Sequence, residues 1–216
     1  MSQTRPVPRK QIPRKQIPMD LTPAPDFTFD SFIEAPSNQG ALNGVRSWPA
    51  WPSPAVLLLG PEGTGKTHLG EAWLKASHGV FLDDAHTRGE DTLFGFINRA
   101  LRGDIPGLLL ASRVPPTDWG VSLPDLRSRL SAMPKIELFE PDDDSLRPIT
   151  RALFQRRGRE VTTDVVDYLL KYSDRSIPAL SAVIRDIDEA ASSAKADVTK
   201  VFASKVLREN MDMFDE

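Results

Sequence analysis

The stretch Ala55-Val56-Leu57-Leu58-Leu59-Gly60-Pro61-Glu62-Gly63-Thr64-Gly65-Lys66-Thr67 decides the fold class. Its first five residues form an apolar run that ends at Gly60, which is typical of a strand buried on both faces of a parallel sheet. The next eight residues fit the pattern G-x-x-x-x-G-K-S/T, and a helix is expected over residues 65 to 77. A glycine-rich loop between a strand and a helix is the context in which this motif binds phosphate. The stretch therefore predicts a nucleotide-binding P-loop.

Each part of the predicted loop has a chemical task. Glycines let the backbone turn its N–H groups toward the phosphates, and the following helix directs its positive end at them. Lys66 neutralises the β- and γ-phosphate charges, and Thr67 offers its hydroxyl to Mg²⁺. His68 follows directly and is given no catalytic role. We expect ATP or ADP with Mg²⁺ as the ligand. The predicted nucleotide-binding residues are Gly60, Pro61, Glu62, Gly63, Thr64, Gly65, Lys66, Thr67 and His68.

Two neighbouring acids follow a second short apolar run, Val80-Phe81-Leu82, which we interpret as a second buried strand. Asp83, at the end of this strand, is predicted to be the magnesium-holding acid together with Thr67. Asp84 stands where a water-orienting catalytic acid would stand. The alternative for Asp84 is that it caps the loop that follows.

Further alternation of helices and strands predicts the rest of the body. Helical spacing covers residues 90 to 102, and strands are expected at residues 107 to 111 and 135 to 139. Such alternation implies a parallel sheet. Three or four amphipathic helices then fill residues 143 to 209. The acids around Asp142 are interpreted as the cap of the first of these helices rather than as a metal site.

The amino-acid composition excludes several classes of protein and of functional site. The 216 residues carry 27 Lys and Arg against 30 Asp and Glu, a net charge of −3, which argues against a protein that coats nucleic acid. The absence of cysteine excludes disulfides, thiolate metal sites and cysteine nucleophiles. The sequence contains no apolar run of about 18 residues, the length that a membrane span needs. A cytoplasmic protein with no membrane contact is expected.

Proline divides the chain unevenly, with 10 of the 19 prolines in residues 1 to 54. Residues before proline avoid helical geometry, so an extended arm is predicted at the start of the chain. Trp48 to Pro54 is interpreted as a linker before the first strand. The predicted organisation is an arm at 1–22, a nucleotide-binding core at 23–139, and a helical subdomain with an acidic tail at 140–216.

The order of several motifs resembles the nucleoside-triphosphatase module of the bacterial initiator DnaA, and more closely the Hda-type regulators of DnaA. The resemblance covers about residues 16 to 207. It is carried by Gln16-Ile17-Pro18-Met19-Asp20-Leu21, Phe27-Thr28-Phe29-Asp30-Ser31-Phe32, Gly65-Lys66-Thr67-His68-Leu69, Leu82-Asp83-Asp84, Pro115-Pro116 and Leu123-Pro124-Asp125-Leu126-Arg127-Ser128-Arg129-Leu130.

This resemblance implies an AAA+ fold, in which a parallel sheet is followed by a helical lid. It also implies that Arg129 is an arginine finger, presented to the nucleotide of a neighbouring subunit. An arginine in such a sequence is otherwise an ordinary solvated residue on a helix face. DnaA is then the expected partner, and a homo-oligomer is also allowed.

The same resemblance implies a function for the arm. Gln16, Ile17, Met19 and Leu21 are similar to a sliding-clamp-binding peptide of the form Q-x-x-L/M-x-L/F. In such peptides the glutamine and two apolar side chains enter separate pockets while the backbone stays extended. The DNA polymerase sliding clamp is therefore an expected partner.

The sequence also departs from the family pattern. Only 17 positions separate Lys66 from Asp83, where AAA+ modules place a further strand and helix, so we expect a sheet shortened at its edge. Arg113 stands where initiators carry an acid. Pro178 replaces the expected lid arginine and leaves Arg175 one turn away. These changes predict poor hydrolysis of the chain's own ATP.

Three functions are considered for a chain with these motifs. The preferred one is a clamp-tethered negative regulator of replication initiation that promotes hydrolysis of DnaA-bound ATP through Arg129. The second is a P-loop helicase loader or adaptor ATPase, which has no need of the Gln16 motif. A metabolic phosphotransferase is disfavoured because no general base other than Asp84 is evident. No helix-turn-helix domain follows the predicted lid, so sequence-specific DNA binding is not expected.

Overall fold

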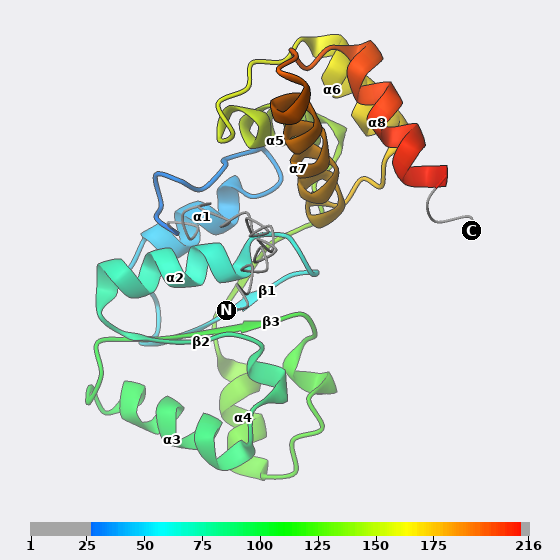
Figure 1. The fold of residues 1–216 in the computed structure, drawn as a ribbon. Coiled ribbons are helices and arrows are strands. Elements are labelled where there is room, and N and C mark those ends of the chain that lie inside the picture. The colour runs from blue at the N-terminus through cyan, green and yellow to red at the C-terminus, as the bar shows by residue number, and fades with distance from the viewer. Residues whose placement is uncertain (1–26, 213–216) are drawn as a thin grey trace, which may run out of the picture.

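A parallel sheet with helices on both faces, followed by a bundle of helices, makes up the computed structural model, which describes residues 27–212 (Figure 1). The predicted clamp-binding residues Gln16, Ile17, Met19 and Leu21 lie outside this described part. Its elements are α1 (Gln39–Arg46), β1 (Ala55–Leu59), α2 (Lys66–Ser77), β2 (Val80–Leu82), α3 (Glu90–Leu101), β3 (Leu108–Ser112), α4 (Pro124–Ala132), β4 (Lys135–Glu137), α5 (Asp143–Gln155), α6 (Thr163–Tyr172), α7 (Ile177–Ala194) and α8 (Lys200–Asp212).

The sheet has the strand order β2-β3-β1-β4 within the described residues, and its pairs are all parallel. Leu57 of β1 lies opposite Leu110 of β3, and Leu108 of β3 lies opposite Val80 of β2. The four predicted strands are confirmed to within two residues at their ends. The prediction that Val80-Phe81-Leu82 is a buried strand is wrong, because β2 lies at the sheet edge and its residues are half-buried.

The two faces of the sheet carry different helices, α1 and α2 on one side and α3 and α4 on the other (Figure 1). Alternate strand residues face opposite ways. Leu57 of β1 therefore packs in the same core as Leu93 of α3, whereas Leu58 packs with Leu69 and Trp73 of α2. The result is one apolar layer on each face of the sheet.

The segment from Trp48 to Pro54 is more than the linker that the sequence analysis predicted. The Trp51 ring stacks on Trp73 with centroids 5.0 Å apart, and Trp48 meets the same ring edge-on at 6.3 Å. Trp73 itself is fully buried. The segment thus covers α2, because its two aromatic side chains complete the core on that face of the sheet.

The connection between α2 and β2 consists of only His78 and Gly79. A Cβ added to Gly79 would lie 2.5 Å from the Trp73 ring, so the turn packs tightly against α2. The expected shortening of the sheet is confirmed, and β2 occupies the edge that it leaves.

Helices α5 to α8 form a separate subdomain with its own apolar core, which includes Phe154, Leu169 and Ile184. The side chain of Asp142 accepts a hydrogen bond from the Ser145 amide at 2.9 Å, which confirms its role as a helix cap. The Ser37 amide donates to the Ser145 hydroxyl at 3.0 Å and so joins the start of this subdomain to the segment before α1. None of the described helices combines the length and apolar character needed to cross a membrane.

Candidate nucleotide site

The loop between β1 and α2 has the backbone that a phosphate-binding loop requires. Gly63 and Gly65 have φ angles of +74° and +102°, a region that side-chain-bearing residues rarely adopt. A Cβ added to Gly60 would lie 2.6 Å from the Leu138 carbonyl oxygen, so this glycine permits a close backbone approach. Helix α2 begins at Lys66, with Gly65 as its N-cap. The positive end of the helix therefore lies at the loop.

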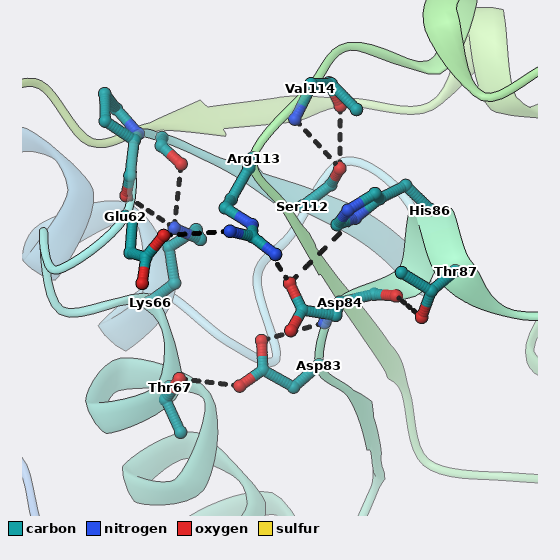
Figure 2. A network of polar contacts seen from close by, with 12 residues as sticks. Glu62, Lys66, Thr67, Asp83, Asp84, His86, Thr87, Ser112, Arg113 and Val114 are labelled. Carbon is teal, nitrogen blue, oxygen red and sulfur yellow. Dashed lines mark hydrogen bonds and ion pairs between the residues drawn. The ribbon is translucent and has the colours of Figure 1, made fainter.

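Lys66 is held inside the loop. Its Nζ donates to the Gly60 carbonyl oxygen at 2.7 Å and to the Pro61 carbonyl oxygen at 2.6 Å (Figure 2). The residue is only 7% exposed. Burial lowers the pKa of Lys66, and the nearby carboxylates of Asp83 and Asp84 oppose this shift. The ammonium is thus poised to exchange these carbonyl oxygens for phosphate oxygens.

Thr67 and Asp83 meet beside the loop. The Thr67 hydroxyl donates to Asp83 Oδ2 at 2.6 Å, and Asp83 Oδ1 accepts from the Asp84 amide at 2.9 Å. A hydroxyl and a carboxylate at this distance fit Mg²⁺, which prefers oxygen ligands and takes few of them from the protein when a phosphate supplies the others. The two residues predicted to hold the metal are therefore side by side.

Asp84 follows β2 with a left-handed backbone, at a φ of +46°. Its Oδ1 lies 3.6 Å from Nε of Arg113 and 4.0 Å from Nδ1 of His86 (Figure 2). The side chain makes no capping hydrogen bond to the helical turn Ala85–Thr87 that follows. Asp84 caps this turn through its backbone only, since its carbonyl oxygen accepts from the Thr87 amide at 2.9 Å and from the Thr87 hydroxyl at 2.8 Å. Its carboxylate is turned toward Arg113.

Arg113 joins two parts of the site that the sequence analysis treated separately. Its Nη1 donates to Glu62 Oε2 at 2.9 Å, while its Nε faces Asp84. The sequence singled out Arg113 only as a departure from the family pattern, and it predicted Glu62 as a nucleotide-binding residue of the loop, without a contact between the two. The pairing depends on the strand order, for which the sequence carries no local signal.

His68, predicted as a nucleotide-binding residue, contacts the segment before α1. Its Nε2 lies 2.9 Å from the Thr28 carbonyl oxygen and 3.2 Å from the Ser31 hydroxyl. The rings of Phe27 and Phe32 lie 5.0 and 5.2 Å from the imidazole, measured between centroids. The described start of the chain is therefore fixed to α2 through His68, a structural role that sequence reasoning missed.

Arg129 lies on α4, on the opposite face of the sheet from α2 (Figure 1). Its guanidinium carbon is 5.4 Å from the centre of the Phe94 ring. The turn before α4 is anchored by Glu90, whose carboxylate accepts from the Ser122 amide at 2.7 Å, the Ser122 hydroxyl at 2.8 Å and the Leu123 amide at 2.9 Å. These donors lower the pKa of Glu90. They also fix the helix that carries Arg129.

The lid touches the P-loop directly. A Cβ added to Gly63 would lie 2.4 Å from the ring of Pro178, near the start of α7. Arg175, the arginine one turn away, is engaged in an ion pair with Asp143. A cavity of about 260 Å³ lies between loop and lid, and Glu62 and Glu140 are among the residues that line it. The lid therefore meets the loop through a proline, and its nearby arginine is held by an acid of α5.

No protein-family model matches the chain, whereas several solved structures superpose on it. Domain III of the Thermotoga maritima initiator DnaA does so with a TM-score of 0.70 at 17% identity, over 86% of this chain and 97% of that one. AMPPCP-bound DnaA from Aquifex aeolicus gives 0.62 at 20% identity, over 76% and 67%. A single-residue variant of Thermotoga maritima RuvB gives 0.62 at 17% identity, over 84% and 71%.

The chain has the AAA+ fold. This confirms the fold expected from the P-loop and the order of the motifs. In this fold, α1 to β4 form the layer built around the sheet, and α5 to α8 form the helical subdomain that follows it (Figure 1).

Proposed function

We propose that this protein is a nucleotide-bound negative regulator of replication initiation that promotes hydrolysis of ATP held by DnaA. The observation that carries the proposal is the placement of Arg129. It lies across the sheet from the α2 face, on a helix that Glu90 anchors, in a chain that superposes on nearly all of DnaA domain III. An arginine in this position suits a neighbouring chain's nucleotide.

The chain's own ligand is ATP or ADP with Mg²⁺. Lys66 is placed to hold the phosphates, and the adjacent Thr67 hydroxyl and Asp83 carboxylate are placed to hold the ion. The Aquifex aeolicus DnaA structure contains AMPPCP, an adenine nucleotide analogue, which supports the adenine base. Bound Mg²⁺ would neutralise charge on the phosphates.

Arg129 acts through charge. During hydrolysis, negative charge spreads over the transferred phosphoryl group, and an arginine supplied by a second protein stabilises it, with effects of about 10³ to 10⁵ in rate in related enzymes. The ring of Phe94 holds the Arg129 guanidinium at the surface of α4. DnaA-bound ATP is the proposed recipient of this arginine.

The sliding clamp is the proposed tether. This part of the proposal rests on the sequence of Gln16, Ile17, Met19 and Leu21, which lie outside the described residues. Clamp binding would restrict the regulator to DNA that is being replicated. It also separates this function from a helicase loader or adaptor, which has no need of the motif.

The first experiment measures binding of the purified chain to the clamp by calorimetry, beside a Gln16→Ala/Leu21→Ala variant. Binding by the wild type alone supports the tether. If neither protein binds, the clamp-tethered model fails and the loader or adaptor becomes the better account.

The second experiment measures hydrolysis of DnaA-bound ATP in the presence of DNA-loaded clamp. We expect Arg129→Ala to abolish the stimulation, because it removes the charge offered to the phosphoryl group. Arg127→Ala is the matched control, since Arg127 is an exposed arginine of the same helix. Equal loss in both variants would argue for a general effect of surface charge and against a finger.

A further inference from the structure

Arg113 occupies a central position that follows from the strand order. It is the first residue after β3, and β3 lies between β2 and β1 in the sheet. From there its guanidinium reaches Glu62 in the loop after β1 and Asp84 after β2, at 2.9 and 3.6 Å (Figure 2). Arg113 therefore links the P-loop to the proposed water-orienting acid.

We propose that Arg113 is a positioning residue that suppresses hydrolysis of this chain's own ATP by restraining Asp84. The inference rests on the proposed function, in which this chain binds ATP, and on the prediction from the sequence that Asp84 orients the attacking water. In hydrolysis, a water oxygen bonds to the γ-phosphorus, the bond from that phosphorus to the β–γ bridging oxygen breaks, and Asp84 accepts a proton from the water. ADP and inorganic phosphate are the products.

The contacts at Asp84 oppose this task. Oδ1 of Asp84 faces the Arg113 guanidinium, so one of the oxygens that would orient the water is already engaged. The effect is on alignment, because a general base must lie within hydrogen-bond reach of the proton that it accepts.

Glu62 makes the restraint persistent. A single exposed ion pair contributes little, because its side chains rotate freely and water screens them. Here a second carboxylate, from the P-loop, holds the other side of the same guanidinium through a 2.9 Å hydrogen bond. Glu62 therefore limits the rotation of Arg113, and Arg113 in turn restrains Asp84.

In this proposal, the chain's own nucleotide site and Arg129 have different roles. Its own nucleotide stays intact for longer and supports the fold around the P-loop, while Arg129 acts on the nucleotide of another protein. The ATP-bound form of this chain would therefore persist, because the chain hydrolyses its own ATP only slowly.

The test compares single-turnover ATP hydrolysis by the wild type and the Arg113→Ala variant, with Mg²⁺ and without partners. Positioned acids and bases contribute about 10²- to 10⁴-fold to rates, so recovery of part of that effect predicts at least an about tenfold increase. Arg113→Gln, which keeps side-chain length without charge, should also raise the rate. Because Arg113 is 44% exposed, both variants are expected to fold.

The variant Arg113→Ala/Asp84→Asn provides the decisive comparison. The increase must disappear in it, since the gain is proposed to pass through the Asp84 carboxylate. Arg102→Ala is the matched control, because Arg102 makes an exposed ion pair with Asp104 at the end of α3. It should leave the rate unchanged.

Titration with fluorescent ADP on the same samples distinguishes failure of this inference from failure of the proposed function. Nucleotide binding with an unchanged or slower rate in Arg113→Ala and Arg113→Gln overturns the inference and leaves the proposed nucleotide site intact. An increase that survives in the double variant also overturns it. Failure of the wild type to bind any nucleotide overturns both proposals.

Discussion

Replacing Lys66 with methionine should remove nucleotide binding while leaving the fold in place. Methionine keeps most of the length of the side chain and its apolar stem. It removes the ammonium that donates to the Gly60 and Pro61 carbonyl oxygens at 2.7 and 2.6 Å. The same ammonium is the group proposed to bind the phosphates.

Two opposing terms set the effect on the free protein. Hydrogen bonds to a charged group contribute about 1.5–3 kcal/mol each, but burial of the Lys66 ammonium has its own desolvation cost. We expect the lost hydrogen bonds and the relieved desolvation cost to cancel to within about 1 kcal/mol in the free energy of unfolding. This corresponds to a change of about 2–4 °C in Tm for a chain of this size. The free variant should therefore melt close to the wild type.

The effect on the liganded protein is larger. A ligand at 100 times its Kd stabilises the folded state by about 2.7 kcal/mol. The same conversion gives an increase of about 5–11 °C in Tm for the wild type. Lys66→Met should lose this increase because its loop no longer offers a positive charge to the phosphates.

Calorimetric melting with and without ADP and Mg²⁺ measures both effects. Lys75→Met is the matched control, since Lys75 is an exposed residue in the last turn of the same helix. It should retain the nucleotide-induced increase. Retention of the increase by Lys66→Met would refute the assignment of Lys66 as the phosphate-binding lysine.

Three further predictions concern the scaffold. Hydrogen bonds from Ser122 and Leu123 lower the pKa of Glu90, so its ionised form stabilises the fold above the ordinary glutamate pKa, and this stabilisation is lost as pH falls through the lowered value. Glu90→Gln should flatten the fall of Tm over that acidic range, and an unchanged pH profile would contradict this. Gly70→Ala should lower stability by about 1–3 kcal/mol in urea titration, because its Cβ would lie 2.1 Å from the Phe81 ring; a gain would show that the ring moves aside. Phe154→Ala should cost about 3–5 kcal/mol and speed amide exchange in α5 to α8. Equal speeding in β1 would show that lid and sheet unfold together.

The strands that are buried on both faces could be predicted, because they are continuous apolar runs in the sequence. β1 and β3 are apolar runs because helices cover both faces of the sheet, and both strands were found to within two residues. β2 was also found, but its burial was overestimated. Whether a strand lies at the sheet edge depends on how many strands pair with it. The residues of β2, Val80 to Leu82, do not show that β2 pairs with β3 alone.

The site was predictable in its local part only. Lys66 and Thr67 follow from one continuous motif, and Asp83 from its place at a strand end. The contact between Arg113 and Glu62 joins residues 51 positions apart, and it exists because β3 lies beside β1. The role of His68 in fixing the Phe27–Phe32 segment was missed for a similar reason, since its partners lie about 40 positions earlier.

The strand order also explains why the shortened sheet still brings the candidate site residues together. The P-loop follows β1, Arg113 follows β3 and Asp83 follows β2, and these three strands are adjacent. The strand expected from the AAA+ pattern would lie beyond β2, on the side away from β1, so its loss removes none of them. Its loss instead exposes the edge of β2, where Phe81 packs against Gly70 of α2. We therefore expect the shortening to affect the stability of this edge more than the chemistry of the nucleotide site.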